Sequence, residues 1–190
     1  MNILITGSKG FVGMNLVAAL KNIKDGKDRT HPELNIESIY EYDINSSNEN
    51  LDFYCKNADI IVNLPGVNRP ENEEEFMEGN FGFVSVMLEM LKKYGNKAPI
   101  IGSSSIQAEL DNPYGKSKKA GEDLLFKYGE ENGVKVMIYR FPNLFGKWCR
   151  PNYNSAVATF CNNIANDLPV TVNDPKHMMT LVYIDDVVEE

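Results

Sequence analysis

Residues 6–13 read Thr-Gly-Ser-Lys-Gly-Phe-Val-Gly and lie between the short apolar run Asn2–Thr6 and the helically spaced run Phe11–Leu20. Gly7 would allow a tight turn, Gly10 would let backbone N–H groups approach a pyrophosphate, and Gly13 would let the helix pack closely on the sheet. The helix N-terminus would add free N–H donors for the phosphates. Three glycines at a strand-to-helix turn therefore predict dinucleotide binding.

Strand-like and helical runs alternate along the rest of the chain. The further predicted strands are Ser38–Asp43, Asp59–Leu64, Pro99–Gly102, Val134–Arg140, Val170–Val172 and Thr180–Ile184. The further predicted helices are Asn48–Asn57, Phe76–Tyr94, one that begins near Tyr114, and Ser155–Ala165. This alternation predicts an α/β fold, a Rossmann-like doubly wound parallel sheet with helices on both faces.

Composition excludes several classes of protein. The 190 residues predict one domain, residues 1–190, and the net charge of −8 argues against a nucleic acid partner. No apolar run reaches the ~18–20 residues of a membrane span, and the N-terminus does not resemble a signal peptide. We therefore expect no membrane partner and a cytoplasmic location. Three cysteines without a CxxC pair and two histidines offer little to a metal ion, so we expect no metal site.

The carboxyl end has an unusual pattern. Asp185 resembles a helix cap after the strand Thr180–Ile184, yet the sequence stops at Glu190. Because a helix of barely one turn cannot bury its apolar face, we expect this chain to be a fragment of something longer, truncated at its C-terminus.

A second motif lies in the middle of the chain. The serines Ser103–Ser105 follow the strand Pro99–Gly102, at the sheet edge where open α/β folds bind ligands. Tyr114 and Lys118 are four residues apart and would share one helix face. An ammonium group beside a phenol would lower the pKa of the tyrosine, so that it could exchange a proton with a carbinol or carbonyl. A serine hydroxyl could bond to the same oxygen.

These motifs, TGSKGFVG, the serine-ended strand and YGKSK, together resemble the extended short-chain dehydrogenase/reductase superfamily, which includes the NAD-dependent epimerases and dehydratases. Asn80, the RxxNxxG run from Arg140 to Gly146 and the pair Asp185–Asp186 match it as well. The runs VNRPEN, SSSIQA, DNPYGKSK and FPNLFGKWCRPNYNSAVATFC are similar to reductase–epimerases of capsular polysaccharide biosynthesis, in which a cupin domain follows the reductase domain. The resemblance implies that this chain is the reductase part, without the cupin and with an incomplete substrate lobe.

The resemblance also implies roles for particular residues. Tyr114 matches the catalytic acid, Lys118 its partner that also holds the nicotinamide ribose, and Ser105 the hydroxyl that polarises the substrate, with Ser104 as the alternative. Asn143 matches a contact of the substrate or of the cofactor loop, and we take it as a substrate-binding candidate. The predicted cofactor-binding residues, besides Tyr114 and Lys118, are Gly7, Lys9, Gly10, Phe11, Val12, Gly13, Asp43 and Leu64.

The implied reaction is reduction of a 4-keto UDP-2-acetamido-2,6-dideoxy sugar towards UDP-N-acetyl-6-deoxy-L-talosamine. The UDP-sugar would be the partner of a homodimeric enzyme. The cofactor would be NADP(H) or NAD(H): the resemblance points to NADPH, whereas Asp43, if it ends the second strand, would bind the adenosine ribose and favour NADH. Asp43 could instead be a later loop aspartate, and Lys9 could screen a phosphate or be a solvated loop lysine.

Two further residues are substrate-binding candidates with ordinary alternatives. Arg69 could pair with a diphosphate or be a surface arginine, and Trp148 could line the sugar pocket or serve packing. Two other functions are open: a nucleotide-sugar epimerase or dehydratase, and a non-catalytic dinucleotide-sensing regulator. A dehydratase would need an acid pair beside the serine, where this chain has Ile106 and Gln107, and a regulator would need no Tyr–Lys pair.

Overall fold

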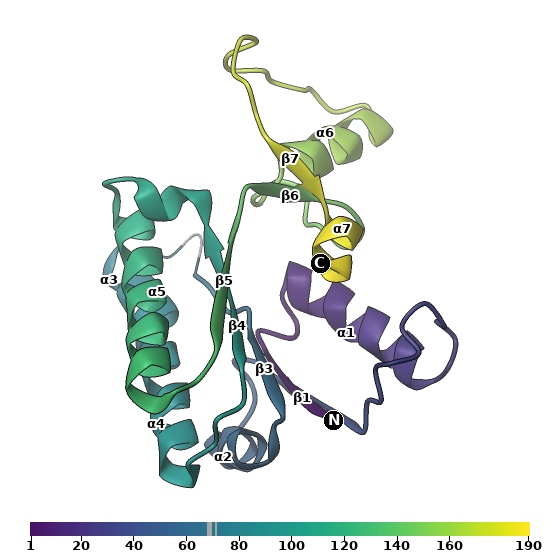
Figure 1. The fold of residues 1–190 in the computed structure, drawn as a ribbon. Coiled ribbons are helices and arrows are strands. Elements are labelled where there is room, and N and C mark those ends of the chain that lie inside the picture. The colour runs from purple at the N-terminus through teal and green to yellow at the C-terminus, as the bar shows by residue number, and fades with distance from the viewer. Residues whose placement is uncertain (68–69, 71) are drawn as a thin grey trace.

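The fold is built on a five-stranded parallel sheet, seen in a computed structural model that describes residues 1–67, 70 and 72–190. The strand order is β2-β1-β3-β4-β5, and β6 and β7 form a separate parallel pair. The strands are β1 (Asn2–Thr6), β2 (Ser38–Tyr42), β3 (Ile60–Asn63), β4 (Ile100–Ser105), β5 (Val136–Phe141), β6 (Asn143–Phe145) and β7 (Leu181–Tyr183). Figure 1 shows the β6–β7 pair and α6 beyond the end of β5.

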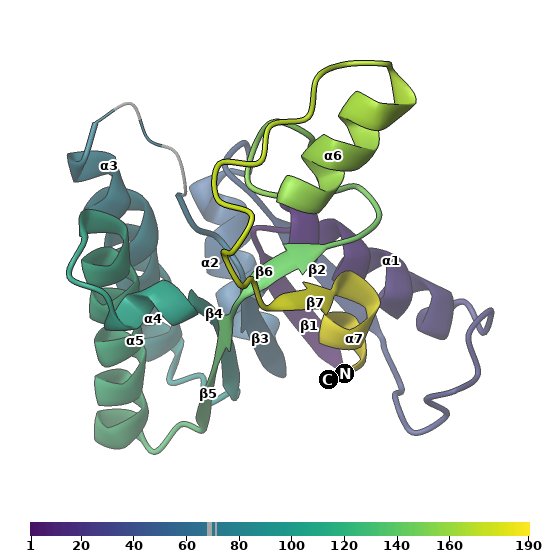
Figure 2. The ribbon, with the colours of Figure 1, turned by 90° about the horizontal axis from the view of Figure 1, so that it is seen from above.

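Helices cover both faces of the sheet. They are α1 (Phe11–Lys24), α2 (Asn48–Asn57), α3 (Glu74–Met77), α4 (Phe83–Tyr94), α5 (Pro113–Asn132), α6 (Ala156–Ala165) and α7 (Ile184–Glu189), with a π-helical turn η1 (Glu78–Gly82) and a 3-10 turn η2 (Ile106–Glu109). Figures 1 and 2 show α1 on one side of the sheet and α2, α4 and α5 on the other. The predicted doubly wound sheet is therefore confirmed.

Two apolar clusters hold these layers together. Ile3 and Ile5 of β1 pack with Val17 and Leu20 of α1, whereas Leu4 packs into the opposite cluster with α2, α4 and α5. Successive residues of a strand point to opposite faces, so a strand buried on both sides is an unbroken apolar run. This is why NILIT at residues 2–6 predicts a central strand.

Two predicted elements differ from the structure, and one strand was not predicted. Residues 170–172 form no strand and are exposed, because no neighbouring strand in the described chain pairs with them. The strand β6 is too short to give a sequence signal. The helix predicted at Phe76–Tyr94 is divided into α3, η1 and α4, since its middle turn is π-helical.

The turn between β1 and α1 depends on a close approach of two backbone segments. A Cβ atom on Gly13 would lie 2.2 Å from the Gly7 carbonyl oxygen and 2.8 Å from the Ser8 Cα, so no other residue fits without moving the backbone. Gly7 itself has a φ of +72°, in the left-handed region that glycine favours. These two glycines bring the start of α1 against the end of β1.

We expect Gly13→Ala to lower the free energy of unfolding by about 2–3 kcal/mol, since the added methyl group meets backbone atoms that cannot rotate away. Urea denaturation followed by circular dichroism measures the loss. Gly10→Ala is the matched control: Gly10 has a φ of −72°, and its Cβ would meet the Gly7 oxygen at 3.2 Å. Equal losses for the two variants would contradict this packing argument.

Candidate active site

The first turn of α1 is open to an anionic ligand. Gly10 is the N-cap residue, and no side chain caps the helix. A Cβ on Gly10 would have one neighbour within 4 Å in the described part of the chain, the Gly7 oxygen at 3.2 Å. The fold therefore does not require glycine at position 10, and the space beside the Gly10 Cα, at the N-terminus of α1, is open. This arrangement fits the pyrophosphate of a dinucleotide. Phe11 and Val12 are partly buried in the same turn.

The glycine turn is tied to the end of β2. Asp43 directly follows β2, and its carboxylate accepts hydrogen bonds from the backbone N–H groups of Lys9 at 2.7 Å and Ile44 at 2.9 Å. The backbone N–H of Ser8 donates to the Tyr42 carbonyl at 3.2 Å. Of the two positions considered for Asp43, the structure has the strand end. Its carboxylate is bonded to the glycine turn, and the Lys9 side chain beside it is exposed.

The loop after β3 lies between the glycine turn and α5. Leu64 donates its backbone N–H to the Thr6 carbonyl at 3.1 Å. A Cβ on Gly7 would lie 2.7 Å from the Pro65 nitrogen, and a Cβ on Gly66 would lie 2.8 Å from Lys118 Nζ. Two adjacent residues of one loop thus touch the glycine turn and the candidate catalytic lysine. Both motifs belong to one site.

Tyr114 and Ser105 meet at the end of β4. Asn112 caps α5 by accepting a hydrogen bond from the Gly115 N–H at 2.7 Å, and Pro113 occupies the first turn. A Cβ on Gly115 would lie 2.2 Å from the Gln107 carbonyl oxygen, so glycine lets α5 begin against η2. The Tyr114 and Ser105 side chains are hydrogen-bonded to each other. The Tyr114 ring also packs on Phe76, with ring centroids 5.6 Å apart.

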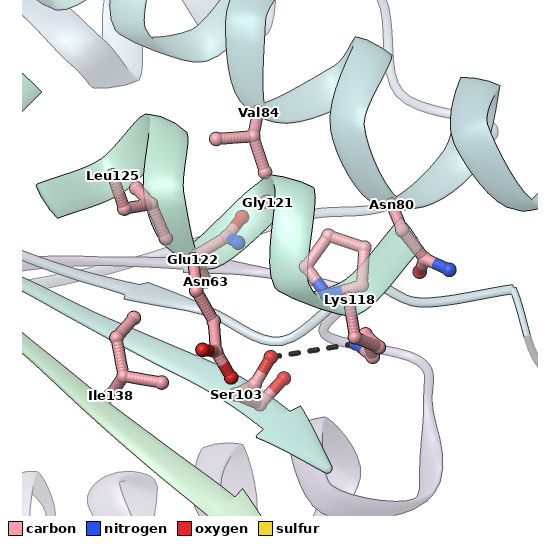
Figure 3. A pocket seen from close by; sticks show the side chains of 10 residues that line it. Asn63, Asn80, Val84, Ser103, Lys118, Gly121, Glu122, Leu125 and Ile138 are labelled. Carbon is pink, nitrogen blue, oxygen red and sulfur yellow. Dashed lines mark hydrogen bonds between the residues drawn. The ribbon is translucent and has the colours of Figure 1, made fainter. Parts of the chain in front are cut away.

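The electrostatic prediction for this tyrosine is wrong in the present structure. Burial raises the pKa of Tyr114, although the hydrogen bond with Ser105 acts in the opposite direction, and Lys118 is not among the causes of the change. The Lys118 ammonium group donates instead to the Ser103 carbonyl at 3.4 Å (Figure 3). Lys118 is buried, and burial lowers its pKa to about 8. Burial of both side chains determines the direction of their pKa changes. The spacing of four residues between Tyr114 and Lys118 does not reveal this burial.

Three buried polar residues near Lys118 were not among the predicted site residues. Asn80, in η1, accepts the Val67 N–H at 3.1 Å and donates to the Ser117 hydroxyl at 2.9 Å. Asn63 accepts from the Thr6 hydroxyl at 2.8 Å, and Glu122 lies one turn after Lys118 on α5. Figure 3 shows all three around a small cavity. The sequence signal for Glu122 is its spacing of four residues from Lys118.

The predicted substrate contacts are less closely grouped. Ser104 is buried and pairs with Arg140 of β5, so it lies deeper than Ser105. Asn143 is exposed at the start of β6, and its side chain donates to the Thr180 carbonyl at 3.3 Å. Trp148 follows β6, is 52% exposed and has a φ of +66°. Arg69 lies outside the described residues.

Two other kinds of site are absent from residues 1–67, 70 and 72–190. No three His, Cys, Asp or Glu side chains gather there in a way that could hold a metal ion. None of the helices within these ranges combines the length and apolarity that a membrane crossing requires.

Comparison with known proteins extends over nearly the whole chain. A UDP-2-acetamido-2,6-beta-L-arabino-hexul-4-ose reductase of Pseudomonas aeruginosa is 46% identical over 188 residues, which are 99% of this chain and 48% of the relative. The crystal structure of the capsular polysaccharide assembling protein CapF from Staphylococcus aureus matches with a TM-score of 0.84 and 48% identity, over 100% of this chain and 48% of that one. This chain thus spans about half the length of these two relatives.

More distant proteins share the fold. A UDP-glucuronic acid 4-epimerase from Bacillus cereus, solved in complex with NAD, is 21% identical with a TM-score of 0.79, over 99% of this chain and 72% of that one. The NAD dependent epimerase/dehydratase family matches residues 3–189, which include the glycine turn, Ser105, Tyr114 and Lys118. The chain therefore belongs to the NAD dependent epimerase/dehydratase family.

Proposed function

We propose that this chain carries the cofactor-binding and proton-donating part of a nucleotide-sugar reductase. The observation that carries the proposal is the loop of Pro65 and Gly66, which contacts the glycine turn on one side and Lys118 on the other. A dinucleotide bound at the glycine turn would then lie within reach of Tyr114 and Lys118. The substrate class is proposed from the Pseudomonas aeruginosa relative: a 4-keto UDP-2-acetamido-2,6-dideoxy sugar.

The proposed reaction needs a hydride and a proton. A bound nicotinamide cofactor would supply the hydride to C4 of the sugar. Tyr114 would donate the proton to the carbonyl oxygen, and the Ser105 hydroxyl would bond to that oxygen. Burial raises the pKa of Tyr114, so the phenol carries its proton at neutral pH and could donate it as the oxygen acquires negative charge. Lys118 would hold the nicotinamide ribose with its ammonium group.

We propose that substrate binding involves β6 and the loop that follows it. Asn143 and Trp148 are exposed beyond the carboxyl edge of the sheet, on the side where β6 and α6 lie (Figure 1). Trp148 is a bulky residue with a positive φ, which is a strained backbone conformation, and such strain is typical of binding sites. The buried Ser104 is less suited to a substrate contact than Ser105.

The first test concerns the cofactor site. Gly10→Val would direct a branched side chain into the open space before α1, so we expect affinity for the reduced dinucleotide to fall by at least about tenfold, or 1.4 kcal/mol. Nicotinamide fluorescence during titration measures binding. Circular dichroism should show an unchanged fold, and Gly13→Ala serves as the contrasting variant that loses stability. Unchanged affinity in Gly10→Val would place the cofactor elsewhere.

The second test concerns the proton donor. Tyr114→Phe keeps the ring on Phe76 but removes the hydroxyl, so turnover of the 4-keto sugar should fall by about 10²–10⁴ while dinucleotide affinity changes little. Steady-state rates and a dinucleotide titration, each measured on the variant and on the parent, separate the effect on turnover from the effect on affinity. Phe76→Leu, which alters the packing and leaves the hydroxyl, is the control. Full activity in Tyr114→Phe would rule out the proposed chemistry.

The third test concerns the choice between NADPH and NADH. We propose NADPH, because the exposed Lys9 ammonium group is available to a 2′-phosphate, while both oxygens of Asp43 accept backbone hydrogen bonds. Lys9→Met should weaken NADPH binding by about tenfold, or 1.4 kcal/mol, and NADH binding by much less. Parallel titrations measure the ratio. Tighter binding of NADH by the parent, together with no change in Lys9→Met, would assign the preference to Asp43 and to NADH.

A further inference from the structure

Glu122 is a buried carboxylate with no part in the proposed reaction. It lies on α5, four residues after Lys118, and is 3% exposed. A carboxylate this deeply buried is costly unless it is paired with an opposite charge. We therefore expect a positively charged partner for Glu122 and a function for the pair.

Arg140 is that partner, and it fixes the carboxylate in one orientation. Its Nε donates to Glu122 Oε1 at 2.9 Å and its second terminal nitrogen to Oε2 at 2.7 Å. This bidentate geometry is the strongest that the two side chains can form. Burial is the largest single influence on Glu122 and would raise its pKa, but the hydrogen bonds and positive charge of Arg140, with contributions from Ser104 and Lys119, together outweigh it, and the pKa is lowered. Glu122 is therefore ionised, and Arg140 holds it in place.

The carboxylate shares a small cavity with Lys118. The cavity has a volume of about 20 Å³, and its other lining residues are neutral: Asn63, Pro65, Asn80, Val84, Ser103, Gly121, Leu125 and Ile138 (Figure 3). Within the described residues no carboxylate forms a salt bridge with Lys118, whose ammonium group has the long hydrogen bond to the Ser103 carbonyl. Glu122 is thus the charged group that faces Lys118 across this cavity.

We infer that Glu122 is a positioning residue for Lys118: clamped by Arg140, it holds a fixed negative charge across the cavity from the ammonium group. The inference rests on the proposed function, which gives Lys118 its role. In this arrangement β5 influences the candidate catalytic lysine through the ion pair of Arg140 with Glu122.

The charge of Lys118 is sensitive to this arrangement. Burial lowers the pKa of Lys118 to about 8, and the negative charge of Glu122 acts in the opposite direction. The ammonium group therefore loses its proton as the pH rises through about 8. Tyr114, one turn earlier on α5, is neutral at this pH, since burial raises its pKa further above its ordinary value. Without the Glu122 charge, Lys118 should deprotonate at a lower pH.

The test follows the pKa of Lys118 directly, by NMR of lysines labelled with ¹³C at Cε. The Lys118 signal is assigned by its absence from Lys118→Arg. We expect Glu122→Gln to lower the pKa of Lys118 by about one pH unit or more. The matched control is Glu109→Gln, since Glu109 also accepts from Arg140, at 2.8 Å, but is exposed. It should leave the pKa of Lys118 unchanged.

A purely structural role would give a different result. Glu122→Gln would then lose stability without moving the Lys118 titration, and that outcome overturns the inference. If Glu122→Gln alone does not fold, the double variant Glu122→Gln with Arg140→Met removes both charges together and carries the same expectation.

A binding titration separates this inference from the proposed function. The affinity of the parent for the reduced dinucleotide should fall as the pH rises above about 8, and in Glu122→Gln the fall should begin at a lower pH. A parent that binds no dinucleotide at any pH contradicts the proposed function, whereas the NMR result still decides the role of Glu122.

Discussion

The backbone of residues 64–67 is confined between the glycine turn and α5, and this confinement connects the parts of the site. Pro65 approaches Gly7, Gly66 approaches Lys118, and the Asn80 amide binds the N–H of Val67. A side chain at position 7 would meet the backbone of Pro65, whereas one at position 66 would displace the Lys118 ammonium group. The site therefore depends on the absence of a side chain at position 7, on a small residue beside Lys118, and on one buried amide that holds the loop between them.

The π-helical turn explains how that amide reaches the loop. Asn80 lies in η1, and its side chain joins the loop backbone to the Ser117 hydroxyl of α5. A π turn shifts the register of the helix, and such turns are frequent at functional sites. The apolar spacing of residues 76–94 predicts one continuous helix. Periodicity indicates which face of a helix is buried, but it does not reveal a single widened turn. Sequence patterns also fail to predict β6, because it has only three residues. They wrongly predict a strand at residues 170–172, where the two valines have no partner strand in the described part of the chain.

Local patterns nevertheless predict much of the site. The order of glycine turn, serine-ended strand and Tyr–Lys helix follows the chain, and the parallel sheet brings these segments to one edge. The spacing of Tyr114 and Lys118 predicts a shared helix face but not the solvent exposure of each group. Burial then reverses the predicted electrostatic effect: the phenol of Tyr114 holds its proton more tightly, and the ammonium group of Lys118 holds its own less tightly. Long-range packing determines these energies, and sequence spacing does not contain it.

The ion pair beneath α5 is better explained by electrostatics than by stability. Replacing a buried ion pair with apolar residues of similar volume is often neutral or stabilising, so Arg140 and Glu122 are a poor means of holding β5 to α5. Apolar contacts of Leu125 and Ile138 already join these elements. What apolar residues cannot supply is a fixed negative charge beside a buried lysine. A lysine that is mostly removed from water needs such a charge to stay protonated near neutral pH, and a clamped carboxylate provides it without occupying the space in which a ligand would bind.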